Sequence, residues 1–429
     1  MDTVDRPFHR RHLLRGLGGI ATLTAIAPAV LGSSSARATT TTVLASGLPE
    51  VVGMSSERIE DVFARVQRRV NDGLFPGATA LIARRGVIVG HRAFGNKVAG
   101  STEPVTLDTM FDVLSLTKVL ATATAVLVLN QQGKLLLSDK VAAYLPFFGA
   151  NGKSGVTVLD MLRYSAGLPV DNQLLDEPNA KTVWRAMAET PLEYTPGSSV
   201  LYSDLTYRLL GRLVEIVSGA DLSTFARAHI WGPLGMHDTM FNPPAELAPR
   251  VAATGYSIRR GRLVRGEVQD EQDFALGGIT GCDGVFSTAM DVAIFCQMIL
   301  GLGSYGAVRV LTPHSVDRMT RNQTPQVTAA ATDTSPLNNL LLAPKGLGWE
   351  LWTPRFSTGG TRLSPGSFGK AGGAGTFMWI DPARELFGVL LTNHGLPEPF
   401  DDIGWNRMID SIGVVEFFDG VIGAVAEEC

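Results

Sequence analysis

The sequence predicts an α/β (α+β) fold in which an antiparallel sheet, built from N- and C-terminal strands and flanked by helices, carries a mostly helical inserted domain. Strand-like apolar runs lie near both ends of the chain, whereas helical spacing dominates the roughly 200 residues between them. With 429 residues, 45% of them hydrophobic, the chain can also bury a large core. We expect a sheet region at about 51–114 and 345–425 and a helical region at about 115–344, packed in layers.

The charge balance argues against nucleic acid as a partner. Charged residues make up only 18% of the chain, the formal net charge is −4, and no block of like charge stands out. The three cysteines, Cys282, Cys296 and Cys429, form no CxxC pair. We interpret them as small buried apolar residues or a free terminal thiol, with a Cys282–Cys296 bridge in an exported protein as the less favoured alternative.

Residues 1–38 have the features of a twin-arginine signal peptide. Arg10 and Arg11 precede an uncharged, mildly apolar stretch at 16–31, and Ala36-Arg37-Ala38 fits the small-residue cleavage rule. The alternatives are a disordered basic N-terminus and a membrane anchor, but the short and weak apolar run argues against an anchor. We therefore predict export to the periplasm or the extracellular space, a flexible mature N-terminus at 39–50 and no stable membrane span after signal removal.

Folded structure is predicted to begin near Ser55 with a helix whose N-cap is Ser55 or Ser56, and whose apolar residues recur at helical spacing, with Gly73 near its end. Two strands follow, Ala78–Ala83 and Val87–Phe94. The short segment Arg84-Arg85-Gly86 between them is typical of a hairpin turn.

The stretch from Leu116 to Leu129 carries no Pro or Gly and is apolar almost all round, with Gly133 as its stop. A helix of this composition is typical of a protein interior. Ser115 and Lys118 stand at its start, and their spacing places both side chains on one face of the first turn. The lysine can exchange a proton with the hydroxyl, and the N–H groups of the helix start can stabilise an oxyanion. We interpret the pair as a nucleophile with its activator; an ordinary helix start is the plain alternative.

Further elements are predicted along the rest of the chain. A loop punctuated by Pro and Gly is expected at 325–348. The clearest helices are Val158–Arg163, Leu205–Val217 and a final helix at Trp405–Gly413, and the clearest strands are Thr376–Ile380 and Leu386–Thr392.

Two later segments carry candidate functional residues. In 193–204, a Pro-Gly turn leads to Tyr202-Ser203-Asp204, which opens the next helix. In 369–376, a lysine and several glycines run into an edge-type strand whose backbone can approach a ligand closely. The sequence holds no Gly-x-Ser-x-Gly, no His-Glu-x-x-His and no other metal-ligand spacing, so we predict neither an α/β-hydrolase elbow nor a metal.

Taken in order, Ser115-x-x-Lys118, Tyr202-Ser203-Asp204 and Lys370-Ala371-Gly372 resemble the motifs of the serine β-lactamase and penicillin-recognising superfamily. The resemblance is greatest to its class C β-lactamase-like, D-peptidase and carboxylesterase (family VIII) branch. It covers nearly everything after residue 50, including Ser165–Pro169 and Phe377–Asn393. It implies a β-lactamase-like domain at 51–425 that works through an acyl-enzyme and uses no cofactor.

The resemblance implies a role for each matching residue. Ser115 would be the acylated nucleophile, Lys118 its activating neighbour, and Tyr202 would share proton transfer; which of the last two is the base stays open. The backbone N–H groups of Ser115 and Gly373 would form the oxyanion hole. Water would then release the acyl group in the second step.

The implied substrate-binding residues are Asp204, Lys370, Ala371 and Gly372. Asp204 replaces the asparagine of the lactamases and, when ionised, cannot donate to an acyl-amide carbonyl, although it could pair with Lys118 or cap the Leu205 helix. Ala371 replaces a hydroxyl residue that could bind a substrate carboxylate. The retained Lys370 suits a substrate bearing a carboxylate, with a solvent-facing lysine at a strand start as the alternative.

These departures leave the substrate class open. We expect an exported serine hydrolase, first of all an esterase on small acyl esters, with a D-amino-acid peptidase or amidase and a weak class C-like β-lactamase as alternatives. A non-catalytic protein that binds β-lactams or cell-wall fragments, and an acyltransferase, are the alternatives from other classes. The expected partner is a small-molecule acyl substrate: an ester, a D-peptide or a β-lactam.

Overall fold

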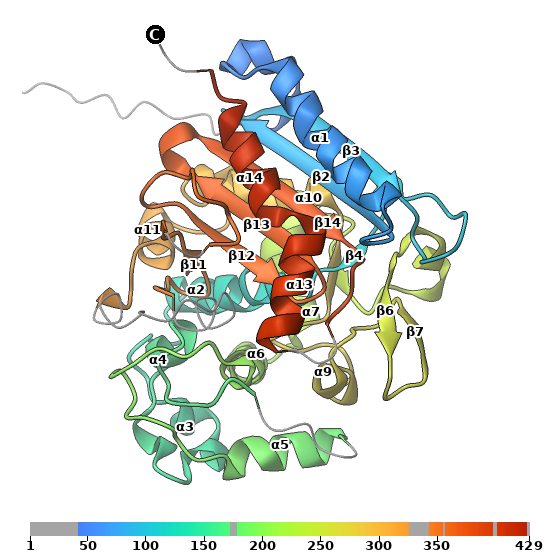
Figure 1. Cartoon of the computed structure of the whole chain (residues 1–429). Helices are drawn as coiled ribbons and strands as arrows, with labels where there is room; N and C mark the ends of the chain where they lie inside the picture. Colours follow the sequence, from blue (N-terminus) through green and yellow to red (C-terminus); the bar gives the residue numbers. More distant parts are fainter. Residues whose placement is uncertain (1–41, 172–177, 326–342, 355–356, 398–400, 427–429) are drawn as a thin grey trace, which may run out of the picture. The chain divides into compact units, whose positions relative to one another are not determined.

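A seven-stranded sheet joins strands from the two ends of the chain (Figure 1). The computed structural model describes residues 42–171, 178–325, 343–354, 357–397 and 401–426; the predicted signal peptide, most of the predicted loop at 325–348, and Cys429 lie outside them. The strand order is β1-β3-β2-β14-β13-β12-β11. The strands are β1 Ala45–Ser46, β2 Gly77–Arg84, β3 Val87–Gly95, β11 Glu350–Leu351, β12 Phe368–Gly372, β13 Thr376–Asp381 and β14 Leu386–Thr392.

The N- and C-terminal strands meet in the middle of this sheet. Strand β14 runs antiparallel to β2, with Leu390 opposite Ala80. The β2–β3 hairpin turns at Arg85 and Gly86, which both have positive φ. Strand β1 is parallel to β3, whereas the other pairs of the sheet are antiparallel. The predicted antiparallel sheet from both chain ends is confirmed.

One face of the sheet is covered by the first and last helices of the described chain. These are α1 (Ser56–Asn71), α13 (Asp402–Ile412) and α14 (Val414–Gly423), drawn in blue and red in Figure 1. The N-cap of α1 is Ser55, as predicted, and its side chain accepts a hydrogen bond from Arg58 N–H. Helix α14 buries Phe417 and Phe418 in the cluster that contains Phe63 of α1.

The opposite face carries α10 (Ala289–Leu300), which packs against β2, β13 and β14. Residues from this face belong to the larger hydrophobic cluster, which also holds the predicted apolar helix. That helix is continuous from Leu114 to Gln131 and begins with the single turn η2 (Leu114–Leu116). A π-helical segment, η3 (Lys118–Ala123), and α2 (Thr124–Gln131) follow.

The helix Leu114–Gln131 is the one candidate, among the described residues, that is long and apolar enough to cross a membrane. The apolar composition of this helix is explained by its position, because 83% of the helix is buried inside the protein. A core helix passes the same test of length and hydropathy, so the predicted interior position agrees with the structure.

Most of the remaining elements of the described chain lie between η3 and β11 in the sequence. They include the helices α4 Val158–Leu162, α5 Ala180–Glu189, α6 Asp204–Ser218 and α9 Glu271–Ala275. Other helices are η1 Pro49–Val52, α3 Val141–Tyr144, η4 Pro146–Gly149, η5 Lys153–Gly155, α7 Leu222–Ala226, η6 Arg227–Trp231, α8 Gly232–Leu234, η7 Ala245–Arg250, α11 Pro313–Thr320 and η9 Pro382–Arg384. Short strands are β4 Phe111–Asp112, β5 Met240–Phe241, β6 Ala253–Ser257, β7 Arg262–Arg265, β8 Val285–Ser287, β9 Ser304–Tyr305 and β10 Val308–Arg309.

One predicted element needs correction at the C-terminus. The helix predicted at Trp405–Gly413 is not the final one, because α14 follows it directly. Gly413 adopts φ of +68° and ends α13, as a C-terminal glycine should. The same glycine then precedes the first residue of α14, so a pattern that reads glycine as a stop hides the second helix.

Candidate active site

Ser115 lies at the mouth of the buried helix, in a turn held by its neighbours. Val113 N–H donates to the carbonyl of Val285 over 3.0 Å, and Leu114 N–H donates to Asp112 Oδ1 over 3.1 Å. Leu114 has φ of +41°, a conformation that costs energy for any residue with a side chain. From residue 109 to residue 129, Ser115 is the one residue that is not buried, so the chain is partly exposed at this position.

Three side chains surround this hydroxyl. Lys118 Nζ donates to Ser115 Oγ over 2.7 Å, and Tyr202 OH donates over 2.9 Å. Ser115 Oγ in turn donates to Asp283 Oδ1 over 3.2 Å. The three residues that the sequence singled out as catalytic candidates therefore converge, and Asp283 joins them.

Lys118 is fully buried and held between two carboxylates. Its Nζ lies 2.8 Å from Asp204 Oδ1 and 3.6 Å from Asp283 Oδ1, and it also donates to Cys282 Sγ over 3.0 Å. Burial disfavours the ammonium, but the attraction of Asp204 and Asp283 outweighs it, so the pKa of Lys118 is raised well above its ordinary value. The lysine is a fixed cation.

Tyr202 lies in the segment predicted to follow a Pro-Gly turn. Its ring stacks on that of Tyr164, with ring centroids 4.8 Å apart. Burial raises the pKa of the Tyr202 phenol well above its usual value, with Lys118 opposing. Three lysine side chains also lie over the ring, with the Nζ atoms of Lys118, Lys345 and Lys370 at 5.1, 5.9 and 4.4 Å from its centroid. Tyr202 is thus a neutral phenol, positioned to donate its proton.

Asp204 is the first residue of α6, and Ser203 is the N-cap. The alternative interpretation of Asp204 as the cap of this helix is therefore wrong. Its carboxylate pairs with Lys118 instead, as the sequence suggested. Burial acts to raise the pKa of Asp204, but Lys118 and Arg208 hold it below its usual value. Asp204 is therefore ionised at neutral pH.

Strand β12 lies directly against the turn that carries Ser115. A Cβ atom added to Gly372 would lie 2.4 Å from the carbonyl oxygen of Val113, which requires glycine at this position. The hydroxyl of Thr376 donates to the same carbonyl over 2.9 Å. Gly373 directly follows β12, so the backbone segment expected to supply the second oxyanion donor lies beside the nucleophile turn.

Lys370 is buried on β12 and already paired. Its Nζ lies 2.8 Å from Glu350 Oε1, and the N–H of Ala371 donates to the same oxygen over 3.4 Å. Burial lowers the pKa of Lys370, while Glu350 opposes that effect. The alternative of a solvent-facing lysine is therefore wrong, and the lysine has a carboxylate partner within the protein.

Asp283 and Glu350 were missed by sequence reasoning. Asp283 follows Cys282 in the loop between α9 and β8, and both are buried. A lone carboxylate just before the apolar pair Val285 and Phe286 was a usable signal, because buried aspartates need a partner. Glu350 carries no such signal, since its partner Lys370 is distant in sequence.

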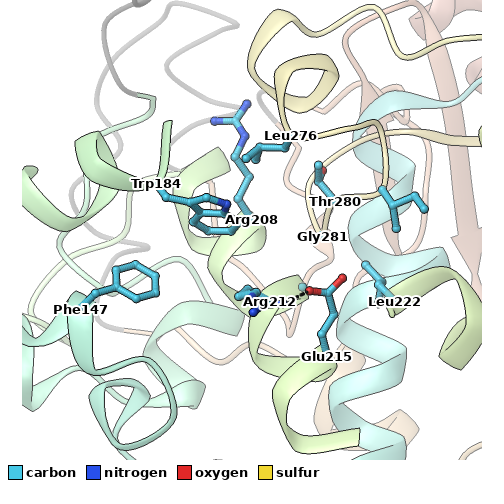
Figure 2. Close-up of a pocket in the computed structure, with 11 residues that line it drawn as sticks. Phe147, Trp184, Arg208, Arg212, Glu215, Leu222, Leu276, Thr280 and Gly281 are labelled. Carbon is cyan, nitrogen blue, oxygen red and sulfur yellow. Dashed lines mark hydrogen bonds and ion pairs between the residues drawn. The ribbon is translucent and has the colours of Figure 1, made fainter. Parts of the chain in front are cut away.

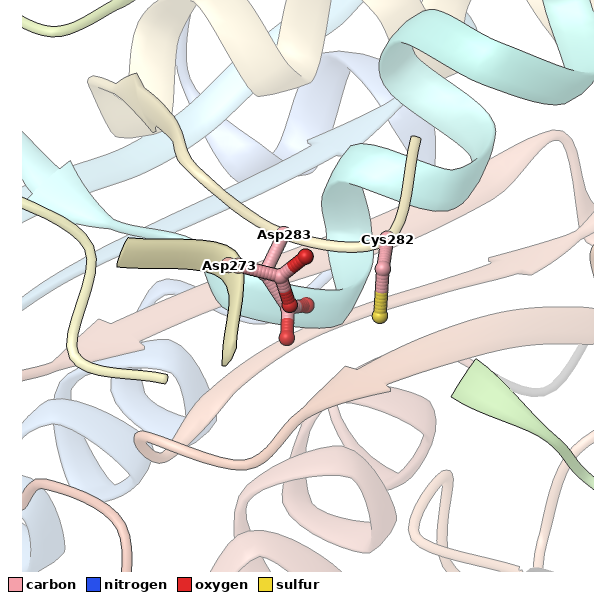
Figure 3. A group of neighbouring side chains, drawn as sticks. All are labelled: Asp273, Cys282 and Asp283. Atoms are coloured by element: carbon pink, nitrogen blue, oxygen red, sulfur yellow. The ribbon is translucent and has the colours of Figure 1, made fainter. Parts of the chain in front are cut away.

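Among the described residues, one cluster has ligand atoms close enough to hold a metal: Asp273, Cys282 and Asp283 (Figure 3). Its negative charge is already balanced, because Arg208 binds both oxygens of Asp273 at 3.0 Å and Lys118 contacts the other two residues. A divalent cation would have to displace or repel these two cations. Cys282 and Cys296 are both free, so the less favoured bridge between them is wrong.

A cavity of about 460 Å³ lies beside α6 (Figure 2). Two aromatic residues, Phe147 and Trp184, line it together with Arg208 and Gly281. Ser115 does not line this cavity. It is therefore separate from the hydroxyl and supports no acyl-binding role for these two aromatic residues.

Comparison with known proteins assigns the chain to a family. Residues 62–411 match the family model described as Beta-lactamase. A protein of Escherichia coli K12, provisionally named a D-alanyl-D-alanine carboxypeptidase, is 32% identical over 391 residues, which cover 82% of this chain and 86% of that protein. A relative of the same name in Salmonella typhimurium is 31% identical over 401 residues, or 84% of this chain and 88% of its own.

Solved structures support the same fold. EstCE1, described as a hydrolase with promiscuous acyltransferase activity, aligns with a TM-score of 0.65 at 21% identity, covering 83% of this chain and 99% of that one. A penicillin-binding protein homologue from Caulobacter crescentus aligns with a TM-score of 0.66 at 22% identity, covering 85% and 98%. With the family match over most of its length and relatives above 30% identity, this chain belongs to the beta-lactamase family of serine hydrolases.

Proposed function

We propose that this chain is an exported serine hydrolase that forms an acyl-enzyme on Ser115, with small acyl esters as its first substrate class. One observation carries the proposal. Ser115 is the partly exposed residue at the start of an otherwise buried helix, and Lys118 and Tyr202 donate to its hydroxyl over 2.7 and 2.9 Å. A hydroxyl between a fixed cation and a phenol is arranged to exchange protons during acyl transfer.

In the proposed reaction, Ser115 Oγ attacks the acyl carbon, and the N–H groups of Ser115 and Gly373 bind the oxyanion. The Lys118 ammonium, held in place by Asp204, faces the leaving oxygen and supplies its proton, with Tyr202 as the second donor. Water then attacks the acyl-enzyme in the same site and releases the acid.

Two contacts favour an ester over a peptide with a terminal carboxylate. Lys370, which would bind that carboxylate, is buried against Glu350 and would have to leave this partner. Asp204, held as an anion by Lys118, accepts hydrogen bonds but cannot donate to an amide carbonyl.

The second candidate is a D-amino-acid peptidase or amidase. It is favoured by the names of the Escherichia coli and Salmonella relatives. Weak β-lactam hydrolysis is a third possibility on the family match alone.

Side-by-side rates on p-nitrophenyl esters of increasing acyl length, on a D-alanyl-D-alanine peptide and on nitrocefin test the substrate class. The proposal expects the highest kcat/KM on a short ester and no turnover by Ser115→Ala. A preference for the D-alanyl peptide would overturn the ester assignment in favour of the second candidate. A stable adduct without turnover of any substrate would indicate a binding protein, and ester products formed with added alcohol would indicate a transferase.

Export rests on residues 1–38, with Arg10 and Arg11 as the determinant. Fractionation of cells that express the full chain, or its double Arg→Lys variant at these two positions, tests it. Equal recovery of both proteins outside the cytoplasm would contradict the twin-arginine route.

A further inference from the structure

We infer that Asp283 is a further catalytic residue, whose carboxylate accepts the Ser115 proton as the acyl-enzyme forms. The inference rests on the proposed function and names the base within that site. Asp283 Oδ1 lies 3.2 Å from Ser115 Oγ, within the roughly 2.6–3.2 Å reach expected of a general base. Because Asp283 contacts the oxygen that attacks the substrate, it can take part in the reaction itself and does not merely hold the loop in place.

The hydrogen-bond count at Ser115 Oγ points to this acceptor. A serine hydroxyl has one proton to donate and two lone pairs that accept. Lys118 and Tyr202 both donate to Oγ and occupy the lone pairs. The single proton of Ser115 is donated to Asp283.

The two residues implied by the family resemblance are in the wrong protonation state to accept it. The Lys118 ammonium donates to Ser115 Oγ and to the carbonyl and sulfur of Cys282, and it forms an ion pair with Asp204. Its raised pKa keeps it protonated. The Tyr202 phenol also keeps its proton, because burial raises its pKa. An ammonium and a phenol in these states donate protons, and neither offers a basic lone pair.

Asp283 has the complementary properties of a base. Burial raises the pKa of Asp283 to about 6, with Lys118 opposing. A carboxylate with a pKa near the working pH is still ionised at neutral pH and is a stronger base than an ordinary aspartate.

The proton balance closes within three residues. The Ser115 proton moves to Asp283 as Oγ bonds to the acyl carbon. When the bond between the acyl carbon and the leaving oxygen breaks, Lys118 gives that oxygen a proton. Asp283, 3.6 Å from Lys118 Nζ, returns its proton to the lysine. In the second step water loses its proton to Asp283, and Ser115 Oγ leaves and regains its proton from Lys118. Asp283 then passes its proton to Lys118 again, which restores the starting state.

Many charges face Asp283, so its titration has to be separated from theirs. The group comprises Lys118 on η3, Asp112 on β4, Tyr202, Asp204 and Arg208 on or beside α6, Asp270 and Asp273 at α9, and the adjacent Cys282. Asp204 offers a matched control. It is the other carboxylate on Lys118, at 2.8 Å, but it donates nothing to and accepts nothing from Ser115 in the structure.

The test measures the rate of fluorophosphonate acylation against pH, from about 4 to about 9, for the full-length protein and two variants. The wild-type rate should fall as the pH drops through about 6, because Asp283 becomes protonated. Asp283→Asn should acylate about 10²–10⁴-fold more slowly and lose this acidic limb. Asp204→Asn should retain the limb, whatever its rate.

Asp283→Glu keeps a carboxylate and should restore part of the rate, with an acidic limb at a shifted pH. Thermal unfolding of each variant shows whether it is folded. Acylation of folded Asp283→Asn within about threefold of wild type, or an unchanged acidic limb, would overturn the inference. A wild-type rate that does not fall between pH 8 and pH 4 would overturn it even if every variant unfolds. Ser115→Ala stays unlabelled in each case, so these outcomes leave the proposed function standing.

Discussion

Two buried cations, Lys118 and Arg208, lie on either side of one group of carboxylates. Lys118 contacts Asp204 and Asp283. Arg208, which is 1% exposed, binds Asp171, Asp270 and Asp273, the last through both oxygens. Buried charges survive only when paired and hydrogen-bonded, so this network fixes the position of the loop that carries Asp283.

The network makes a prediction about stability at Arg208. Arg208→Ala should lower the free energy of unfolding by about 3–5 kcal/mol, because it removes the cation that binds the buried Asp273 and the partly buried Asp171 and Asp270. Arg212, one turn later on α6, is the control: its pair with Glu215 is half exposed, and Arg212→Ala should cost about 1 kcal/mol or less. Urea unfolding of both variants measures the difference, and equal costs would show that the buried network contributes nothing special.

The same residues show how far sequence reasoning reaches at this scale. Ser115 and Lys118 could be predicted because they form a local pair at a helix start, and Tyr202 because its segment resembles a family motif. Glu350 could not, since its partner Lys370 lies 20 residues away. Asp283 carried only the signal of a lone carboxylate before an apolar pair, and its contact with Ser115, 168 residues away, is a tertiary fact. The same limit applies to Lys370: its motif indicates a binding residue, but burial against Glu350 is a tertiary fact.

At the scale of elements, the helix start and strand β12 form one unit. Gly372 lets the strand backbone approach Val113, and Thr376 on the next strand bonds to the same carbonyl. The strained Leu114 stands between that carbonyl and Ser115. The position of the nucleophile thus depends on a strand more than 250 residues later in the chain.

Gly372→Ala tests this coupling. The new methyl group would press on the Val113 carbonyl and displace the turn, and a shift of about 1 Å is expected to reduce acylation about 10²-fold. Gly155→Ala is the matched control, because a methyl group there meets nothing within 4 Å. Labelling rates of the two folded variants decide the matter; a wild-type rate for Gly372→Ala would show that β12 does not position Ser115.

Elements with a clear period or cap were predictable, and those set by context were not. The apolar helix and strands β2, β13 and β14 follow their patterns, because burial on both sides leaves largely apolar runs. The π-helical turn at Lys118–Ala123 and the second C-terminal helix depend on local packing and on a glycine with positive φ, which no pattern reveals.

At the scale of the whole molecule, N-terminal and C-terminal segments of the described chain pair in one sheet and pack together. Strand β14 completes the N-terminal hairpin, and α14 packs on α1. Ser55 N–H also donates to Ala424 O over 2.9 Å. This closure brings the Ser115 helix, the Tyr202 turn and the Asp283 loop to one end of the sheet, although Tyr202 and Asp283 are 87 and 168 residues from Ser115 in the chain.

Formation of the acyl-enzyme tests the account most directly. Mass spectrometry of the protein after a fluorophosphonate probe should show one adduct, mapped to the peptide that contains Ser115. Lys118→Ala and Tyr202→Phe should slow its formation by about 10²-fold or more, because each removes a donor from Oγ. An adduct on another residue, or equal labelling of Ser115→Ala, would contradict the assignment of Ser115 as the nucleophile.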